Sequence, residues 1–125
     1  MGKNNKRPVH LNLFVIRLPV TGVVSIVHRL TGVLLVLVFP FFLYLLQESL
    51  RDPAGFENVR ELLRSPTGRV LSLLALWLVA QHFFSGLRHL LLDVEIGMER
   101  VQARLGAWLV FAASLLTVVA VGWLA

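Results

Sequence analysis

The chain alternates between long apolar stretches and short polar connections. Three stretches contain no Asp, Glu, Lys or Arg: Leu30–Leu46, Val70–Leu87 and Leu105–Ala125, which hold 17, 18 and 21 residues. About 20 apolar residues in a helix cross a hydrocarbon core about 30 Å thick. The first stretch is short, but Val20–Val27 is also uncharged and extends it. The pattern therefore predicts an all-α membrane protein with three transmembrane helices, at about residues 20–46, 69–92 and 102–125.

The polar segments divide the chain into an arm and one membrane domain. Pro8 and Pro19 discourage a continuous helix over residues 1–19. We expect this part to be an extended cytoplasmic arm that lies along a soluble partner. Residues 20–125 then form a single three-helix transmembrane domain.

Proline and glycine also shape the helices and their connections. Pro40 predicts a bend in the first helix. Ser49–Gly68 contains two prolines and is expected to be the longer loop, with a short interfacial helix over Phe56–Leu63. A tight polar turn is expected after Asp93.

The amino-acid composition agrees with a membrane protein. The chain has 125 residues, of which 57% are hydrophobic, and its mean hydropathy of +0.77 is too high for an ordinary soluble domain of this size. It contains no cysteine, which excludes disulfides, thiolate metal sites and cysteine nucleophiles. The basic N-terminus precedes an apolar run, as in a signal peptide. That run carries His28 and Arg29 and has no A-x-A-like cleavage site, so we expect a retained helix.

The net charge of +5 is explained by membrane orientation, and no nucleic-acid partner is expected. Basic residues of membrane proteins cluster on the cytoplasmic side. Seven lie before the first helix or around the second connection: Lys3, Lys6, Arg7, Arg17, Arg88, Arg100 and Arg104. The first connection has four arginines balanced by four carboxylates. This bias predicts a cytoplasmic N-terminus and a C-terminus on the outer side.

The second predicted helix carries ionisable residues along one face. At 100° per residue, His89 lies about 20° to one side of His82 and Asp93 about 20° to the other, and Gly86 lies about 40° from His82. Imidazole is a common iron ligand, and haem iron takes axial ligands such as histidine. Gly86 removes a side chain that would obstruct a flat porphyrin. This stripe is therefore compatible with a haem site.

The first predicted helix has a second polar face. Ser25, His28, Arg29 and Gly32 are spaced i, i+3, i+4 and i+7. Arg29 would lie about 13 Å into the membrane if Val20 is near the inner surface. An arginine at that depth needs a partner, and its fork of donors suits a haem propionate or a quinone carbonyl.

Simpler interpretations stay open for these residues. A histidine within the membrane can serve as an interhelix hydrogen-bond partner, and Gly32 and Gly86 can serve helix packing. Arg88 lies near its helix end and can extend to the interface. Spacing alone therefore leaves a haem site and an interhelix hydrogen bond equally open.

Two segments resemble a known family. They are Ser25-Ile26-x-His28-Arg29-x-Thr31-Gly32 and His82-x-x-x-Gly86-x-Arg88-His89-x-x-x-Asp93. Together they look like the paired signatures of the cytochrome b membrane-anchor subunit of succinate dehydrogenase, respiratory complex II. The opening Arg7-Pro8-x-x-Leu11-x-Leu13 also resembles that family's N-terminal arm.

The resemblance implies a role for each matching residue. His82 would be the axial ligand of haem b iron, with His28 and Arg29 beside the propionates. Ser25 and Arg29 would line the quinone site, and Asp93 would lie near that site at the cytoplasmic edge.

The chain is expected to hold only half of these pockets. It offers one well-placed axial histidine, so a six-coordinate haem needs a second ligand from another chain. A second small membrane-anchor subunit is therefore predicted. The resemblance adds an iron–sulfur subunit and a flavoprotein subunit on the cytoplasmic face. Iron–sulfur clusters belong to those partners, because this chain has no cysteine to bind them.

The expected function is that of a membrane anchor in the cell inner membrane, surrounded by lipid. Electrons from succinate would reach a quinone through the flavin and iron–sulfur centres of the partners, and this chain would do no chemistry on succinate. Two alternatives stay open. One is a haem-free anchor in which His82 bonds to a neighbouring helix. The other is a small transporter with Arg29, His82 and Asp93 along a cation or proton path, although no broken-helix repeat supports it.

Overall fold

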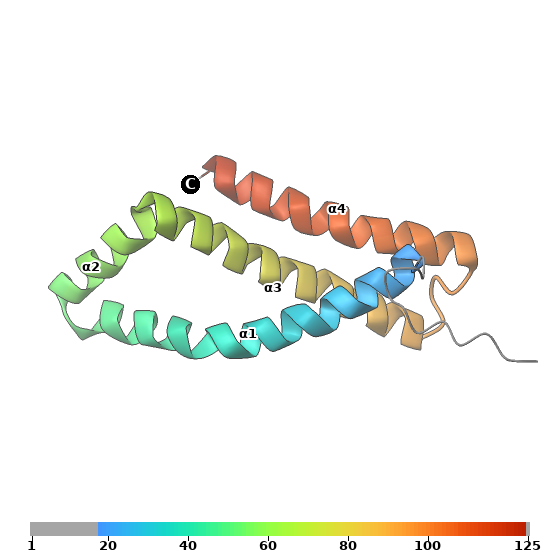
Figure 1. The fold of residues 1–125 in the computed structure, drawn as a ribbon, viewed down its shortest axis with the longest axis horizontal. Helices are drawn as coiled ribbons and strands as arrows, with labels where there is room; N and C mark the ends of the chain where they lie inside the picture. The colour runs from blue at the N-terminus through green and yellow to red at the C-terminus, as the bar shows by residue number, and fades with distance from the viewer. Residues whose placement is uncertain (1–17, 125) are drawn as a thin grey trace, which may run out of the picture.

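Four helices form the part of the chain that the structure describes. The structure is a computed structural model, and it describes residues 18–124. The helices are α1 (Val20–Arg51), α2 (Pro53–Arg64), α3 (Pro66–Asp93) and α4 (Arg100–Leu124). In Figure 1, α1, α3 and α4 run lengthwise, and α2 joins the ends of α1 and α3. The predicted N-terminal arm, apart from its last two residues, lies outside the described residues.

The prediction of three transmembrane helices is confirmed. α1, α3 and α4 are each long and apolar enough to cross a membrane. Large apolar side chains are exposed on all three, as in Val36 of α1, Leu74 of α3 and Leu116 of α4. A lipid environment accepts such a surface, whereas water would not over so large an area.

The helix bounds differ from the prediction at the first connection. α1 continues to Arg51, and most of the segment expected to be a loop is the 12-residue helix α2. The expected short helix Phe56–Leu63 is confirmed but extends further in both directions. α2 and α3 each begin with a capping residue followed by proline, Asp52-Pro53 and Ser65-Pro66. Such pairs favour a helix start, because proline at the first position lacks only an N–H that would be unpaired anyway.

Two glycines allow the chain to reverse at this end of the bundle. A Cβ atom at Gly55 would overlap the carbonyl oxygen of Glu48, and one at Gly68 would overlap that of Leu62. Any larger residue would push α2 away from α1 and α3. The short connections therefore depend on glycine at both corners.

The membrane helices pack through small and medium-sized residues. Val24 of α1 is fully buried against Ala107 and Val110 of α4, with Phe84 of α3 packed beside them. Short side chains let helix backbones approach closely, which is a main source of attraction between helices in lipid. The resulting core lies where α1, α3 and α4 meet.

A buried polar network joins α3 to α4. The hydroxyl of Ser114 donates to Gln81 Oε1 at 2.6 Å, and Gln81 Nε2 donates to Ser85 Oγ at 3.3 Å. All three side chains are fully buried. Unpaired polar atoms are costly in a membrane interior, so each member holds the others in place.

Arg88 adds a second polar link between the same helices. Its Nη2 donates to the carbonyl oxygen of Ala103 at 3.2 Å, and its side chain passes over Gly106. Arg88 thus ties the end of α3 to the start of α4.

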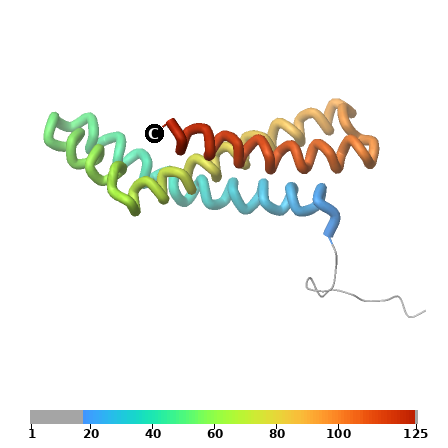
Figure 2. Tube along the Cα trace, turned by 90° about the horizontal axis from the view of Figure 1, so that it is seen from above, coloured from blue at the N-terminus to red at the C-terminus, as the bar shows by residue number. Residues whose placement is uncertain are grey.

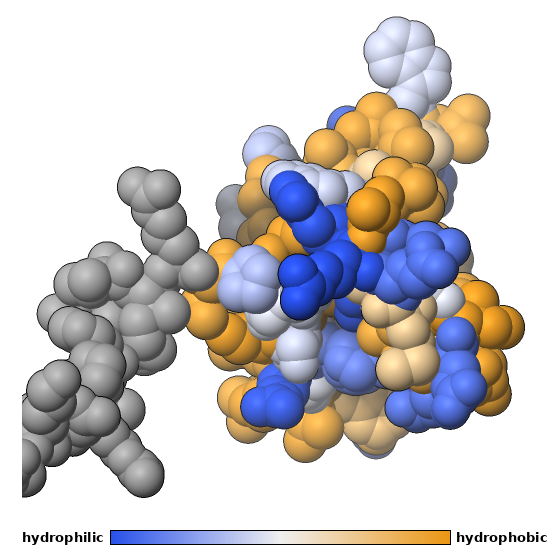
Figure 3. Space-filling model, turned by 90° about the vertical axis from the view of Figure 1, so that its right-hand side faces the viewer, coloured by the Kyte–Doolittle hydropathy of each residue, from blue (hydrophilic) through white to orange (hydrophobic). Residues whose placement is uncertain are grey.

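The ends of the bundle carry polar residues. Successive membrane helices start at opposite ends, as three membrane crossings require. α1 starts at the end where α3 connects to α4, and α2 lies at the opposite end (Figures 1 and 2). Figure 3 looks onto the first of these ends, where hydrophilic side chains gather within an apolar rim. The ribbon of α1 also changes direction along its teal part (Figure 1), and Pro40 lies inside this helix.

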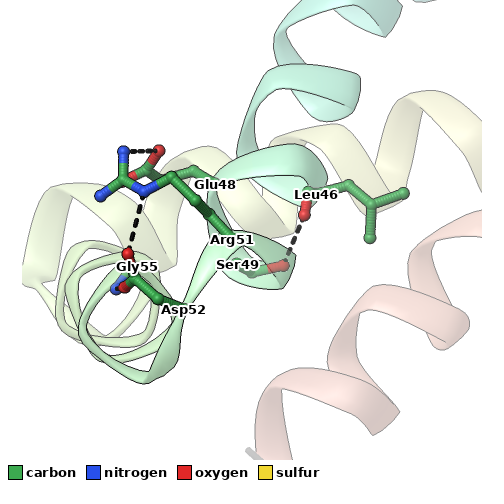
Figure 4. A network of polar contacts seen from close by, with 6 residues as sticks. All are labelled: Leu46, Glu48, Ser49, Arg51, Asp52 and Gly55. Carbon is green, nitrogen blue, oxygen red and sulfur yellow. Dashed lines mark hydrogen bonds and ion pairs between the residues drawn. The ribbon is translucent and has the colours of Figure 1, made fainter.

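The corner between α1 and α2 is held by a small charged network (Figure 4). Arg51 contacts Glu48 at 2.9 Å and Asp52 at 3.1 Å. Asp52 Oδ1 also accepts from the backbone N–H of Gly55 at 2.6 Å and thereby caps α2. The Gly55 N–H and the Arg51 side chain hold the pKa of the Asp52 carboxyl below its ordinary value of 3.8.

This pKa shift predicts how the start of α2 responds to acid. Because the folded-state pKa is lowered, the cap stabilises α2 above pH 3.8 and is lost as the pH falls through the folded-state value. We expect hydrogen-exchange protection at the start of α2 to fall over that range. Asp52→Asn keeps a side-chain acceptor without the charge, so its protection should not depend on pH there. The same pH dependence in both proteins would contradict the role of the carboxylate.

Candidate functional site

Three histidines from two helices meet between α1 and α3. The ring of His28, on α1, is stacked between the rings of His82 and His89, both on α3. The centroid of His28 lies 4.3 Å from that of His82 and 4.9 Å from that of His89, with interplanar angles of 25° and 24°. The structure therefore brings together the two faces that the sequence marked as unusual. We call these three residues the histidine cluster.

A hydrogen bond across the α1–α3 interface fixes the orientation of His82. Its Nδ1 lies 3.2 Å from the carbonyl oxygen of His28 and 3.3 Å from Thr31 Oγ1. A carbonyl oxygen only accepts, so Nδ1 carries the proton and donates it. Nε2 then keeps its lone pair, which is the form that binds a metal.

Thr31 completes this arrangement and was not assigned a role from the sequence. It is 1% exposed, and its hydroxyl donates to the carbonyl oxygen of Val27 at 2.9 Å. Its oxygen can therefore share the one proton of His82 Nδ1, as a second acceptor beside the His28 carbonyl oxygen. The signal was present in the sequence, because Thr31 lies one helical turn after His28 and faces the same side.

Two glycines make reciprocal room for the histidines. A Cβ atom at Gly32 of α1 would lie 3.0 Å from His82 Cε1, and one at Gly86 of α3 would lie 3.4 Å from His28 Nε2. Each glycine thus faces the imidazole of the opposite helix. In this structure the ring of His28 lies over Gly86, and the expectation that this glycine leaves space for a porphyrin stays a prediction.

His89 takes part in the cluster, although no role was predicted for it from the sequence. Its Nδ1 donates to the carbonyl oxygen of Ser85, one turn earlier, at 2.7 Å. This bond turns the ring toward His28. His89 lies two turns from His82 on the same face of α3, so the helical repeat alone places both rings on one side.

The other predicted site residues lie around the cluster without direct contacts to it. Ser25 is half-buried on α1, one turn before His28, and Arg29 and Asp93 are exposed. Within residues 18–124, neither Arg29 nor Asp93 is in an ion pair. The structure therefore places Ser25 and Arg29 on neighbouring turns of one helix and leaves Asp93 at the end of α3.

The donor set fits a haem iron better than a bare metal ion. In the described part of the chain, no group of three or more His, Asp or Glu side chains could hold a metal ion. A haem iron needs only axial ligands from protein, and one histidine with a fixed tautomer can supply one. Arg29 offers donors suited to a propionate on the same side of the interface.

The fold and the site together define a small membrane subunit with three spans and a histidine cluster on two facing helices. The family model described as succinate dehydrogenase/fumarate reductase transmembrane subunit matches residues 3–121. The chain belongs to this family.

Several relatives are similar to this chain over most of its length. The succinate dehydrogenase cytochrome b556 subunit of Coxiella burnetii is 32% identical over 95% of this chain and 96% of its own length. The subunit of the same name from Paracoccus denitrificans is 31% identical over 90% of this chain and 87% of its own. A succinate dehydrogenase hydrophobic membrane anchor subunit of Archaeoglobus fulgidus is 31% identical over 60% of this chain and 64% of its own.

These findings confirm the family that the two signatures predicted. The chain is a membrane-anchor subunit of a succinate dehydrogenase complex, and it functions with other subunits of that complex.

Alanine substitutions at the two glycines beside the histidine cluster, Gly32 and Gly86, are predicted to have unequal effects on stability. A methyl group at residue 32 meets His82 at a distance that requires a shift, whereas one at residue 86 makes ordinary contact with His28. We expect Gly32→Ala to lower the free energy of unfolding by about 1–3 kcal/mol through overpacking, and Gly86→Ala to change it little. Denaturant titration of the purified complex measures both.

The pair provides its own control. Both substitutions change glycine to alanine within a helix, so any gain in helix propensity is common to them. Equal destabilisation, or a larger effect at Gly86, would contradict the packing described here.

Proposed function

We propose that this subunit binds haem b through His82 and helps to form a quinone-reduction site with Ser25 and Arg29. The observation that carries the haem proposal is the hydrogen bond from His82 Nδ1 to the carbonyl oxygen of His28. It leaves Nε2 as the metal-binding nitrogen of a ring whose orientation is already fixed. The relatives from Coxiella burnetii and Paracoccus denitrificans, both named cytochrome b556 subunits, support a haem.

The depth of His82 supports a cofactor held within the bilayer. Along α3, His82 lies about 16 Å from Asp93 and about 20 Å from Arg69. The hydrocarbon core is about 30 Å thick, so His82 lies near its middle. Haem held there would supply a centre that accepts and returns single electrons.

His28 and Arg29 are the residues of this chain that would hold the propionates. Arg29 is exposed at the surface of α1 and forms no ion pair within residues 18–124. A guanidinium at membrane depth gains from a carboxylate partner, and two parallel hydrogen bonds suit its fork. His28 contributes from one residue away, with its ring between those of His82 and His89.

Ser25 and Arg29 would bind the quinone. They lie one turn apart on α1, with Ser25 before His28 and Arg29 directly after it. Arg29 can donate to a quinone carbonyl, and the Ser25 hydroxyl can donate to the same oxygen or to its neighbour. Asp93, exposed at the end of α3, would supply protons for the reduced quinone from the cytoplasmic side.

The remaining parts of the site come from other subunits. A second membrane-anchor subunit would give the other axial ligand and cover the exposed faces of α1 and α3. Flavin and iron–sulfur centres in the soluble subunits would deliver electrons from succinate on the cytoplasmic face of the inner membrane. The N-terminus of this chain would lie on that face, because the basic residues around it and around the α3–α4 connection predict this orientation.

One observation also favours a haem-free anchor. The bond from His82 to the His28 carbonyl is itself an interhelix hydrogen bond of the kind that holds membrane helices together. In that case His82 would have a structural role only. An optical spectrum distinguishes the two functions.

His82 is predicted to be required for the haem spectrum. The purified wild-type complex should show a b-type band in the dithionite-reduced minus oxidised spectrum, and His82→Ala should remove it or shift it strongly. His89→Gln is the matched control, because His89 contacts His28 and not His82. No band in the wild type would support the haem-free anchor, and an unaltered band in His82→Ala would refute the ligand assignment.

Substitutions of Ser25 and Arg29 are predicted to impair quinone reduction but not succinate oxidation. We expect Ser25→Ala and Arg29→Gln to raise KM for quinone or lower kcat by about tenfold or more, since each removes a donor to a developing charge. Succinate oxidation with a soluble dye, which needs only the flavin and iron–sulfur subunits, is the control and should stay constant. An equal loss with dye and quinone would indicate a general defect.

The same assay tests Asp93. If Asp93 passes protons to the reduced quinone, Asp93→Asn should change the pH profile of quinone reduction. An unchanged profile would remove Asp93 from the proposed site.

A further inference from the structure

A cavity lies at the end of the bundle opposite the predicted cytoplasmic side. It has a volume of about 830 Å³ and is bounded by α2, the start of α3 and the end of α4. Its lining includes Arg60, Arg64 and Arg69 together with apolar side chains. None of these residues takes part in the histidine cluster or in the proposed quinone site.

The α3 wall of the cavity changes from charged to apolar along one stripe. Arg69, Ser72, Leu73 and Leu76 all line it, with the spacing i, i+3, i+4 and i+7 of a single helix face. Arg69 lies about 36 Å along α3 from Asp93, which is slightly more than the thickness of the hydrocarbon core. Arg69 is therefore at headgroup level, and Leu76 lies about 10 Å deeper.

The α2 wall of the cavity likewise has an apolar part and a charged part. Phe56 and Leu63 give it an apolar surface, and Arg60 and Arg64 lie one turn apart beside them. The charge of Arg60 is already satisfied by Glu57, at 3.0 Å. Within residues 18–124, Arg64 and Arg69 are in no ion pair.

A second, smaller cavity adjoins the first. It has a volume of about 400 Å³, and its walls of α1, α2 and α3 are almost entirely apolar. Leu63 and Ser72 line both cavities, so the two lie side by side. Apolar space therefore extends from the arginines toward the membrane interior.

We propose that this cavity binds one anionic phospholipid, with its phosphate on Arg64 and Arg69 and its acyl chains along the apolar walls. Guanidinium groups pair with phosphate oxygens through two parallel hydrogen bonds. Basic pockets between transmembrane helices are suited to anionic lipid headgroups. The two arginines and the apolar stripe below them match the two halves of such a lipid in order and in depth.

The lipid would stabilise the corner that α2 makes between α1 and α3. α2 is joined to α1 and α3 by the glycine corners at Gly55 and Gly68, and few of its residues are buried. A ligand that contacts α2, α3 and α4 at once would hold α2 in place. Binding to the folded state alone raises the unfolding temperature.

Lipid binding to the purified complex tests this site. The complex is delipidated in detergent and titrated with phosphatidylglycerol or phosphatidylcholine, and native mass spectrometry counts the bound molecules. We expect one phosphatidylglycerol to bind more tightly than phosphatidylcholine and to raise the unfolding temperature. Arg64→Gln with Arg69→Gln should weaken its binding by about tenfold or more.

Matched variants separate this site from general charge effects. Arg100→Gln with Arg104→Gln removes the same charge at the other end of the bundle, where both side chains are exposed, and should bind phosphatidylglycerol as the wild type does. Arg64→Lys with Arg69→Lys keeps the charge without the fork and should bind with intermediate affinity.

Three results would overturn the proposal. The first is equal binding of the two lipids to the wild-type complex. The second is phosphatidylglycerol binding that the Arg64 and Arg69 glutamine variant retains in full, as expected if a partner subunit fills the cavity. The third is displacement of the lipid by glycerol 3-phosphate at similar concentration, which would indicate a site for free phosphate esters.

Discussion

The hydrogen bond from His82 to the backbone of α1 is the constraint on which the centre of this subunit depends. In a bilayer a polar ring between helices must find its partners inside the protein. His82 does so at the carbonyl oxygen of His28 and at Thr31. That contact requires close approach of α1 and α3, and Gly32 and Gly86 permit it. The proton on Nδ1, the helix separation and the stacked rings therefore all follow from one bond.

The same rule accounts for the other polar groups along the bundle. Within residues 18–124, every buried side-chain nitrogen or oxygen has a hydrogen-bond partner. Gln81 and Ser114 satisfy each other between α3 and α4, and Arg88 uses a carbonyl oxygen of α4. Arg29 and Asp93, which form no ion pair within residues 18–124, are exposed. Polar groups that serve the fold are thus paired within the chain, and those open to a cofactor or a partner lie on its surface.

Much of this arrangement could be predicted because apolar length and helical spacing act locally. The three spans follow from the length of the apolar stretches. The faces with His28 and His82 follow from the repeat that every α-helix shares. The contact of Gln81 with Ser114 could not be predicted, because it depends on how α3 and α4 are rotated against each other. The extent of α2 was missed for another reason: Asp52-Pro53 and Ser65-Pro66 signal helix starts, yet their prolines suggested a loop. Thr31 and His89 were visible as members of a face, but only packing showed what that face contacts.

The histidine cluster is also only half enclosed, which follows from the geometry of three helices. Two of them, α1 and α3, supply the rings, while α4 packs on the other side against Val24 and the Gln81 network. A flat cofactor beside His82 would have this chain on one face and nothing from residues 18–124 on the other. Closure must then come from outside these residues, and the large apolar side chains exposed on α1 and α3 provide a surface for it. If His82 binds haem as proposed, the cofactor and the partner would meet this anchor at one interface, so assembly of the complex and completion of the site would be the same event.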